Sequence, residues 1–295
     1  MKKVVLSVVA ALAFSAAPAF AADMPVKAAP APAPAAAPSQ WDVAFGTALT
    51  TNYVLRGISQ SDRKPAVQGY FELDFKPTDW LTLYAGIWGS SISTVIANAE
   101  FDNSAGARFS WGNFGLDLGA VYYYYPDPAP GSLASLVGNS SISYTEFYAK
   151  PSYKIADWLS VSGQIIGGDD FGNTSQSAWY YSGMVTVTPP ITLPAGITVS
   201  ASTEVGHQTY SGGYKAIPGV FIPGVFGGIE DYTQWNVGID FVYKAITLDL
   251  RYYDTNIDIV NNPTQCATGP TFTTDACKAA FVAMLKFDTT LSALK

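Results

Sequence analysis

The sequence has few of the residues on which catalytic and metal sites usually depend. Its 295 residues include a single histidine, His207, and two cysteines, Cys266 and Cys277. Lys, Arg, Asp and Glu together make up only 13% of the chain. Such a composition offers few groups that bind metal ions or transfer protons. We therefore expect no catalytic site, no metal site, no cofactor and no enzymatic activity.

Long hydrophobic runs and basic charge are also scarce. From Trp41 onward no run of about 18 or more apolar residues occurs, which excludes a membrane-spanning helix from that part of the sequence. The formal net charge is -7, so nucleic acid is not an expected partner. Aromatic residues nevertheless make up 14% of the chain. A soluble protein would be hard to reconcile with so much aromatic surface.

The first residues are typical of a secretory signal peptide. Lys2 and Lys3 precede an apolar segment at 4–14, and residues 19–21 (AFA) supply the small side chains of a cleavage site. We predict a signal peptide over 1–22. A retained membrane anchor is disfavoured because the apolar segment is too short to cross a bilayer.

The next segment, residues 23–40, is dominated by Pro and Ala. It shows neither strand nor helix periodicity and cannot bury enough apolar surface to fold. We expect a flexible, extended linker there, followed by a single domain over 41–295.

Residues 41–61 (WDVAFGTALTTNYVLRGISQS) contain the pattern on which the rest of the chain is built. Odd positions from Trp41 to Leu55 are mostly apolar, whereas the even positions from Asp42 to Asn52, together with Arg56, are small or polar. Successive side chains of a strand point to opposite faces, so this alternation predicts a strand with one apolar face. A membrane-spanning strand needs roughly 9–11 residues with aromatic residues at each interface, and this segment has both.

The same alternation predicts twelve strands in all. Their apolar faces cover 41–55, 67–75, 81–87, 101–109, 116–124, 145–153, 159–165, 179–187, 197–205, 235–241, 246–252 and 281–287. Long loops follow the odd strands and short turns follow the even strands, as outer-membrane barrels require. We predict an all-β fold, a membrane-spanning antiparallel up-and-down β-barrel with long outer loops and short periplasmic turns. A soluble sandwich or an internal-ligand barrel is the alternative.

The charged residues of these strands fall on the face opposite to the apolar one. A Lys or Arg on the lipid face near the midplane costs about 2–4 kcal/mol, so we expect these side chains to point inward. The predicted pore-lining residues are Arg56, Glu72, Asp74, Glu100, Asp102, Arg108, Asp117, Glu146, Lys150, Glu204, Asp240, Asp249 and Arg251. Their acidic excess predicts a preference for cations. Many small inward residues favour an open or gated narrow pore over a salt-bridged plug.

Both cysteines lie in the last predicted outer loop, 254–279. An exported protein matures in an oxidising compartment, so we expect Cys266 and Cys277 to form a disulfide that pins this loop. With no histidine nearby, a metal site at these cysteines is poorly supported.

The single histidine allows one enzymatic alternative. Hairpin pairing through the turn at 188–196 is expected to bring His207 near Ser177, which resembles the outward-facing Ser and His of outer-membrane phospholipases. Neither an oxyanion donor nor an acidic partner can be identified. A solvated histidine at the base of a loop is favoured, and a lipid hydrolase using Ser177 and His207 is the less favoured alternative.

Several short segments resemble a known family. Residues 52–61 (NYVLRGISQS), 64–69 (KPAVQG), 84–88 (YAGIW) and 143–148 (SYTEFY) are similar to the TorF-type porin family of proteobacteria, long catalogued as hypothetical proteins. The resemblance spans most of 41–287. It implies an outer-membrane β-barrel with a porin function and supplies no catalytic residues. The chain departs from the family by ending at Lys295 instead of on an aromatic residue, which bears on how its last strand reaches the assembly machinery.

These observations predict a protein of the Gram-negative outer membrane that passes small hydrophilic solutes or ions passively, with cations favoured. The expected partners are outer-membrane lipid and lipopolysaccharide, the barrel-assembly machinery and the transported solutes. A structural or adhesive barrel with a plugged lumen is the main alternative, and the lipid hydrolase is the less favoured one.

Overall fold

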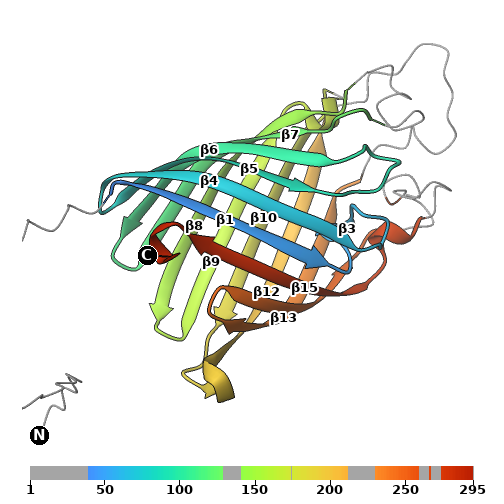
Figure 1. Ribbon diagram of the computed structural model, residues 1–295. Helices are drawn as coiled ribbons and strands as arrows, with labels where there is room; N and C mark the ends of the chain where they lie inside the picture. The colour runs from blue at the N-terminus through green and yellow to red at the C-terminus, as the bar shows by residue number, and fades with distance from the viewer. Residues whose placement is uncertain are drawn as a thin grey trace, which may run out of the picture. The chain divides into compact units, whose positions relative to one another are not determined.

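The structure of the protein is a computed structural model that describes residues 39–128, 141–173, 175–211, 230–258, 266 and 274–294. The signal peptide predicted over 1–22 and the linker predicted over 23–40, apart from Ser39 and Gln40, lie outside the described residues. The described part forms a closed antiparallel β-barrel of twelve strands (Figure 1). This confirms the predicted fold class.

The barrel wall consists of strands that pair in the order of the sequence. They are β1 (Trp41–Thr50), β4 (Ala66–Thr78), β5 (Leu81–Ser90), β6 (Glu100–Trp111), β7 (Phe114–Tyr124), β8 (Tyr144–Ala156), β9 (Leu159–Gly168), β10 (Ser177–Val187), β12 (Ile197–Ser211), β13 (Tyr232–Tyr243), β14 (Ile246–Thr255) and β15 (Ala280–Thr290). The first and last strands, β1 and β15, pair with each other and close the barrel. The two-residue strand β11 (Thr192–Leu193) pairs only with the start of β12.

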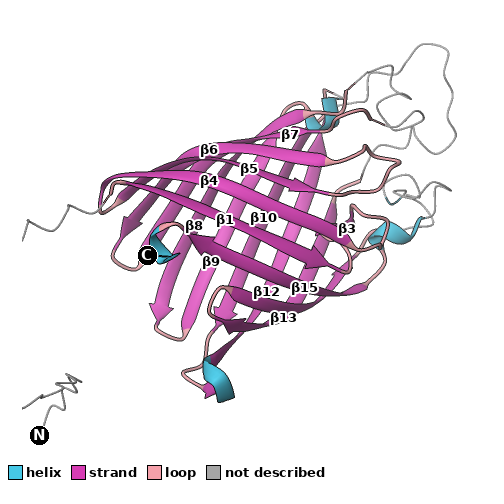
Figure 2. Cartoon of the chain, in the orientation of Figure 1, coloured by secondary structure: helices cyan, strands magenta, loops and turns pink. Residues whose placement is uncertain are grey.

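Four of the five connections at one end of the barrel are two residues long, the exception being 188–196 between β10 and β12, and the strand ends that lead into the other connections lie at the opposite end (Figure 2). Only Asp79 and Trp80 separate β4 from β5, and only Gly112 and Asn113 separate β6 from β7. Gly112 has φ +59°, a conformation that glycine adopts without steric cost in a tight turn. The distribution of loops therefore follows the predicted alternation.

The outer face of the barrel is apolar. Leu49, Phe147 and Phe281 are all more than half exposed, as expected of side chains that contact lipid and not water. Near the short turns, stacked aromatic rings form a band on β6 and its neighbours (Trp80, Phe109, Trp111 and Phe114). A closed barrel with this exterior is an outer-membrane protein.

Helices contribute little to the described structure. They are 3-10 turns: η1 (Phe171–Asn173), η2 (Pro194–Gly196), η4 (Thr274–Cys277) and η5 (Ser292–Leu294). Over the residues described, no helix has the length and apolar character needed to span a membrane.

The first strand is shorter than predicted. It ends at Thr50, which pairs directly with Ala66 at the start of β4. The intervening chain forms a separate hairpin of β2 (Val54–Leu55) and β3 (Ile58–Ser59). We call residues 52–61 the inner hairpin, because their side chains contact the inside of the barrel. The prediction that Tyr53 and Leu55 face lipid was wrong: Tyr53 is 8% exposed, and Leu55 packs against the same interior cluster.

A two-residue turn explains why the chain can reverse at this point. Arg56 and Gly57 join β2 to β3, and their φ angles are +49° and +82°. Positive φ at both central residues is the signature of the tight hairpin turn whose twist matches that of the flanking strands. Alternating apolar residues therefore continue past the end of β1, but in strands that pair with each other and not with the wall.

Candidate functional site

The tip of the inner hairpin binds the far side of the barrel. Arg56 Nη2 lies 2.5 Å from Glu146 Oε2, and Nη1 donates to Glu146 Oε1 at 3.1 Å. Nη1 also donates to Gln208 Oε1 at 3.0 Å. The side chains of Arg56 and Glu146 are only 9% and 1% exposed. A bidentate, water-shielded ion pair of this kind is among the stronger polar contacts in proteins.

Further contacts surround Arg56. Its guanidinium lies 5.2 Å from the centre of the Tyr180 ring, and its carbonyl oxygen accepts a hydrogen bond of 2.9 Å from the Tyr232 hydroxyl. Burial lowers the pKa of Arg56, and the Glu146 carboxylate raises it. The net result is a pKa well above the ordinary value. The guanidinium therefore stays charged.

The strand order shows how far the inner hairpin reaches. It connects β1 to β4, whereas its tip contacts β8, β10, β12 and β13, which lie across the barrel from β1 and β4. Gly57 lies so close to the opposite wall that an added Cβ would be 2.7 Å from Gln234 Cβ. The inner hairpin thus crosses the lumen at its long-loop end.

The root of the inner hairpin is tied together by side chains. Asn52 Oδ1 accepts hydrogen bonds from Ser59 Oγ at 2.6 Å and from Ser61 Oγ at 3.2 Å. The Tyr53 hydroxyl donates to Glu100 Oε1 on β6 at 2.9 Å. The bonds of Asn52 hold the two arms of the hairpin together, and the bond of Tyr53 fixes the hairpin to β6.

Buried tyrosines cluster around the inner hairpin. A cluster of buried side chains includes Tyr53, Tyr84, Tyr123, Tyr125, Tyr144, Tyr148 and Tyr180. Several of these rings lie against glycines of the adjacent strand. An added Cβ at Gly106 would come 2.5 Å from Tyr84 Oη, and one at Gly206 would overlap the Tyr180 hydroxyl. A side chain at either position would force the tyrosine ring to shift, because the ring occupies that space.

One charged cluster lies on β4, β6 and β7. In the Arg108 cluster, Arg108 donates to both Glu72 oxygens at 2.8 Å and to Asp74 Oδ1 at 3.3 Å. Arg108 Nε lies 3.6 Å from Asp117 Oδ2, and Tyr84 donates to Asp117 at 2.7 Å. Three carboxylates thus surround one guanidinium, which leaves this part of the inner face negative.

A second charged cluster lies on β13, β14 and β15. In the Arg251 cluster, Arg251 lies 3.3 Å from Asp249 and 3.9 Å from Asp240, and Lys286 lies within 4.0 Å of both carboxylates. The Oδ1 atoms of Asp240 and Asp249 are buried and accept no hydrogen bond within the described part of the chain. Arg251 also donates to Asn236 and to Ser202.

The thirteen residues of the predicted pore-lining set all lie on the inner face or on the inner hairpin. Arg56 was placed on the first strand by prediction, whereas the structure places it on the tip of the hairpin. Glu100, Asp102 and Glu146 lie near the inner hairpin, Lys150 lies over the Tyr148 ring at 4.2 Å, and Glu204 accepts from Tyr180. The remaining members belong to the two charged clusters.

Sequence reasoning missed several interior residues. Lys286 lies between the outward-facing Leu285 and Phe287, so the same alternation could have identified it. Gln208 and Gln234, each 1% exposed, also have inward parity. The alternation that places charged side chains inward also places these two amides inward.

The structure does not bring Ser177 and His207 together. Ser177 is opposite Ser211, and His207 is opposite Tyr181. Four residues along a strand span roughly 13 Å, so the expectation that these two side chains meet was wrong. Ser177 Oγ donates to Asp169 Oδ1 at 3.0 Å, whereas His207 Nδ1 lies 3.0 Å from Thr233 Oγ1.

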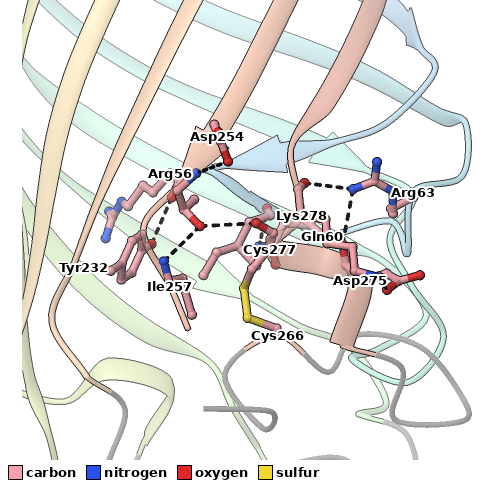
Figure 3. The surroundings of a disulfide bond; sticks show 12 residues. Arg56, Gln60, Arg63, Tyr232, Asp254, Ile257, Cys266, Asp275, Cys277 and Lys278 are labelled. Carbon is pink, nitrogen blue, oxygen red and sulfur yellow. Dashed lines mark hydrogen bonds and ion pairs between the residues drawn. A yellow bond between two sulfur atoms is a disulfide. The ribbon is translucent and has the colours of Figure 1, made fainter. Parts of the chain in front are cut away.

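The predicted disulfide between Cys266 and Cys277 is present. It joins η4 to the preceding part of the outer loop, and η4 with Lys278 and Ala279 forms what we call the disulfide segment (Figure 3). The Arg63 guanidinium donates to the carbonyl oxygens of Asp275, Lys278 and Ala279 at 3.2, 2.9 and 3.0 Å. The disulfide segment is therefore bound to the chain just beyond the inner hairpin.

The described residues contain no group of three or more His, Cys, Asp or Glu side chains placed to hold a metal ion. The carboxylates of the two charged clusters are instead bound to arginine and lysine.

A family model described as "Bacterial protein of unknown function (Gcw_chp)" matches residues 34–286. No protein with a curated description matches the chain. Among solved structures, the NanC porin matches with a TM-score of 0.46 and 9% identity over 84% of this chain and 98% of that chain. An outer-membrane channel from Pseudomonas putida F1 matches with a TM-score of 0.44 and 14% identity over 87% of this chain and 97% of that chain. LpxR from Salmonella typhimurium matches with a TM-score of 0.40 and 10% identity over 83% of this chain and 99% of that chain.

Proposed function

We propose, from the premise that this chain belongs to the bacterial family of unknown function Gcw_chp, that the protein is an outer-membrane channel. It passes small hydrophilic solutes or ions passively and favours cations. The resemblance of residues 52–61 and 143–148 to the TorF-type porin family is consistent with this proposal. No chemical step is part of it.

The acidic excess of the inner face carries the proposal. The thirteen predicted pore-lining residues and Lys286 together comprise nine carboxylates and five basic side chains. Carboxylates arranged around a lumen attract cations and repel anions. In the Arg108 cluster, Glu72 and Asp74 retain exposed fractions of 18% and 12% although both contact Arg108. These carboxylates can therefore act on a hydrated ion in the lumen.

A structural barrel with a closed lumen is the second candidate, and a specific observation favours it. The inner hairpin crosses the lumen, and the ion pair of Arg56 with Glu146 holds its tip. Buried tyrosines cluster around it. The lipid hydrolase gains no such support, because the strand register separates Ser177 from His207.

The remaining partners follow from the exterior. The exposed apolar face matches outer-membrane lipid, and the long loops would lie on the side where lipopolysaccharide forms the outer leaflet. Insertion by the barrel-assembly machinery is proposed on the same grounds.

Single-channel recording in a planar lipid bilayer tests the proposal. With a KCl gradient, we expect discrete conductance steps and a reversal potential of the sign given by cation preference. The double variant Glu72→Gln/Asp74→Asn should reduce that potential, since it removes two lumen carboxylates. Asp157→Asn is the matched control, because Asp157 lies in a short turn and its side chain is 98% exposed. An anion-selective reversal would contradict the proposal.

A further inference from the structure

We infer that the inner hairpin is the closure element of this channel, and that the Arg56–Glu146 ion pair holds it shut. Release of the tip opens the long-loop end of the lumen. The inference rests on the proposed channel function and adds to it the part of the molecule that moves.

The position of the inner hairpin supports this role. Its contacts reach three separate parts of the wall: Tyr53 binds Glu100 on β6, Arg56 binds Glu146 on β8, and Arg56 also binds Gln208 on β12. A segment held at three points around a ring closes the opening between them. An ion moving through this level must pass the hairpin.

The inner hairpin can also move without damage to the barrel. β2 pairs with β3 alone and takes no part in the twelve-stranded sheet. β1 and β4 continue to pair up to Thr50 and Ala66, where the hairpin connection begins and ends. The wall therefore keeps its hydrogen bonds whichever position the hairpin takes.

The two ends of this connection are held by different kinds of contact. Close to its end, Arg63 makes three hydrogen bonds to backbone carbonyls of the disulfide segment (Figure 3). At the tip, among the described residues, the ion pair between Arg56 and Glu146 is the only one. The base is tied to the disulfide segment by exposed hydrogen bonds, whereas the tip is held by a buried ion pair. The closed position is therefore the resting state, and opening requires Arg56 and Glu146 to separate.

The ion pair provides a test that separates closure from simple electrostatics. Arg56→Gln and Glu146→Gln remove opposite charges from the lumen, so their direct effects on ion selectivity have opposite signs. Both variants nevertheless remove the same ion pair at the tip. If the hairpin is the closure element, both must shift the channel toward the open state.

The experiment compares wild type, Arg56→Gln and Glu146→Gln in planar bilayers containing KCl. We expect both variants to raise the ratio of open to closed time about tenfold, the size expected from loss of a hydrogen bond to a charged group. Their reversal potentials should shift in opposite directions. Lys64→Gln is the matched control: it removes the exposed ion pair with Asp62, in the same connection but away from the tip. It should leave the open time unchanged.

A second variant tests the channel function separately from the closure by the inner hairpin. Because Thr50 and Ala66 pair directly, residues 51–65 can be replaced by Asn-Gly, which forms a two-residue hairpin turn. This variant should conduct steadily, without closures. Circular dichroism and heat-dependent migration on denaturing gels verify that each variant folds as a barrel.

The outcomes separate the two ideas. If the folded 51–65 replacement carries no current, the proposed channel function is wrong. If it conducts but closes as often as wild type, the inner hairpin is not the closure element. An unchanged open time in Arg56→Gln and Glu146→Gln, with reversal potentials shifted in opposite directions, would also overturn the inference and leave the channel intact.

Discussion

Arg56 and Glu146 are 90 residues apart in the sequence and meet inside the barrel, with Nη2 of the arginine 2.5 Å from Oε2 of the glutamate. Neither side chain is more than 9% exposed. Both charges have therefore lost most of their hydration, and each depends on the other for compensation. This relationship makes the pair important for stability as well as for closure.

Removing one member of the pair should destabilise the protein more than removing both. Glu146→Met leaves a buried guanidinium without its counter-charge, which typically costs about 3–5 kcal/mol. The double variant Arg56→Met/Glu146→Met replaces both charges with apolar side chains and should recover most of that loss. Urea unfolding in lipid vesicles measures both free energies. Equal losses in the single and double variants would show that the two charges are not coupled.

The disulfide should protect the outer end from proteolysis. In Cys266→Ser/Cys277→Ser, the disulfide segment is no longer tied to the preceding loop, so its bonds to Arg63 should open more often. We expect trypsin to cut after Arg63 and Lys278 about tenfold faster, as followed by mass spectrometry, with the barrel still folded. Cleavage after Lys154, at a short turn, serves as the internal control and should not change. Equal rates at all three sites would contradict this role.

The glycines beneath the tyrosine rings should not tolerate a methyl group. Gly206→Ala places a Cβ where it overlaps the Tyr180 hydroxyl, and overpacking of this kind costs about 1–3 kcal/mol. Gly183→Ala is the matched control on the adjacent strand, since its Cβ meets nothing within 4 Å. Tyr180→Ala should remove the penalty of Gly206→Ala. Urea unfolding tests all three, and the prediction fails if the two glycine variants unfold alike.

Arg108 should moderate the selectivity of the lumen. Arg108→Gln removes the counter-charge of Glu72, Asp74 and Asp117, so we expect a larger cation preference in the reversal potential. Arg108→Lys keeps the charge but loses the two parallel bonds to Glu72, and should lie close to wild type in selectivity. A shift toward anions in Arg108→Gln would contradict the placement of these groups along the conducting path.

Local alternation was sufficient to predict the barrel wall. Side chains of period two define which face contacts lipid, and the lengths of the connections separate the two ends of the barrel. Thus the twelve strands of the wall, apart from the end of β1, were predictable, as were the exterior and the disulfide between Cys266 and Cys277.

What the sequence could not reveal depends on contacts between distant residues. Tyr53 and Leu55 continue the alternation of β1, and no local signal distinguishes a strand in the wall from one that pairs within its own hairpin. The positive φ of Arg56 is a second example, because arginine does not usually adopt it. The separation of Ser177 from His207 likewise depends on the register of β10 with β12, which spacing alone does not determine.

The direct pairing of Thr50 with Ala66 has a consequence for how this barrel can change. The barrel wall and the segment that crosses the lumen are joined at this one pair of residues. The segment can therefore be altered while the wall is kept, and the wall can be altered while the segment is kept. Engineered connections of different length or charge could be placed between these two residues, and each would give the same barrel a pore of different size.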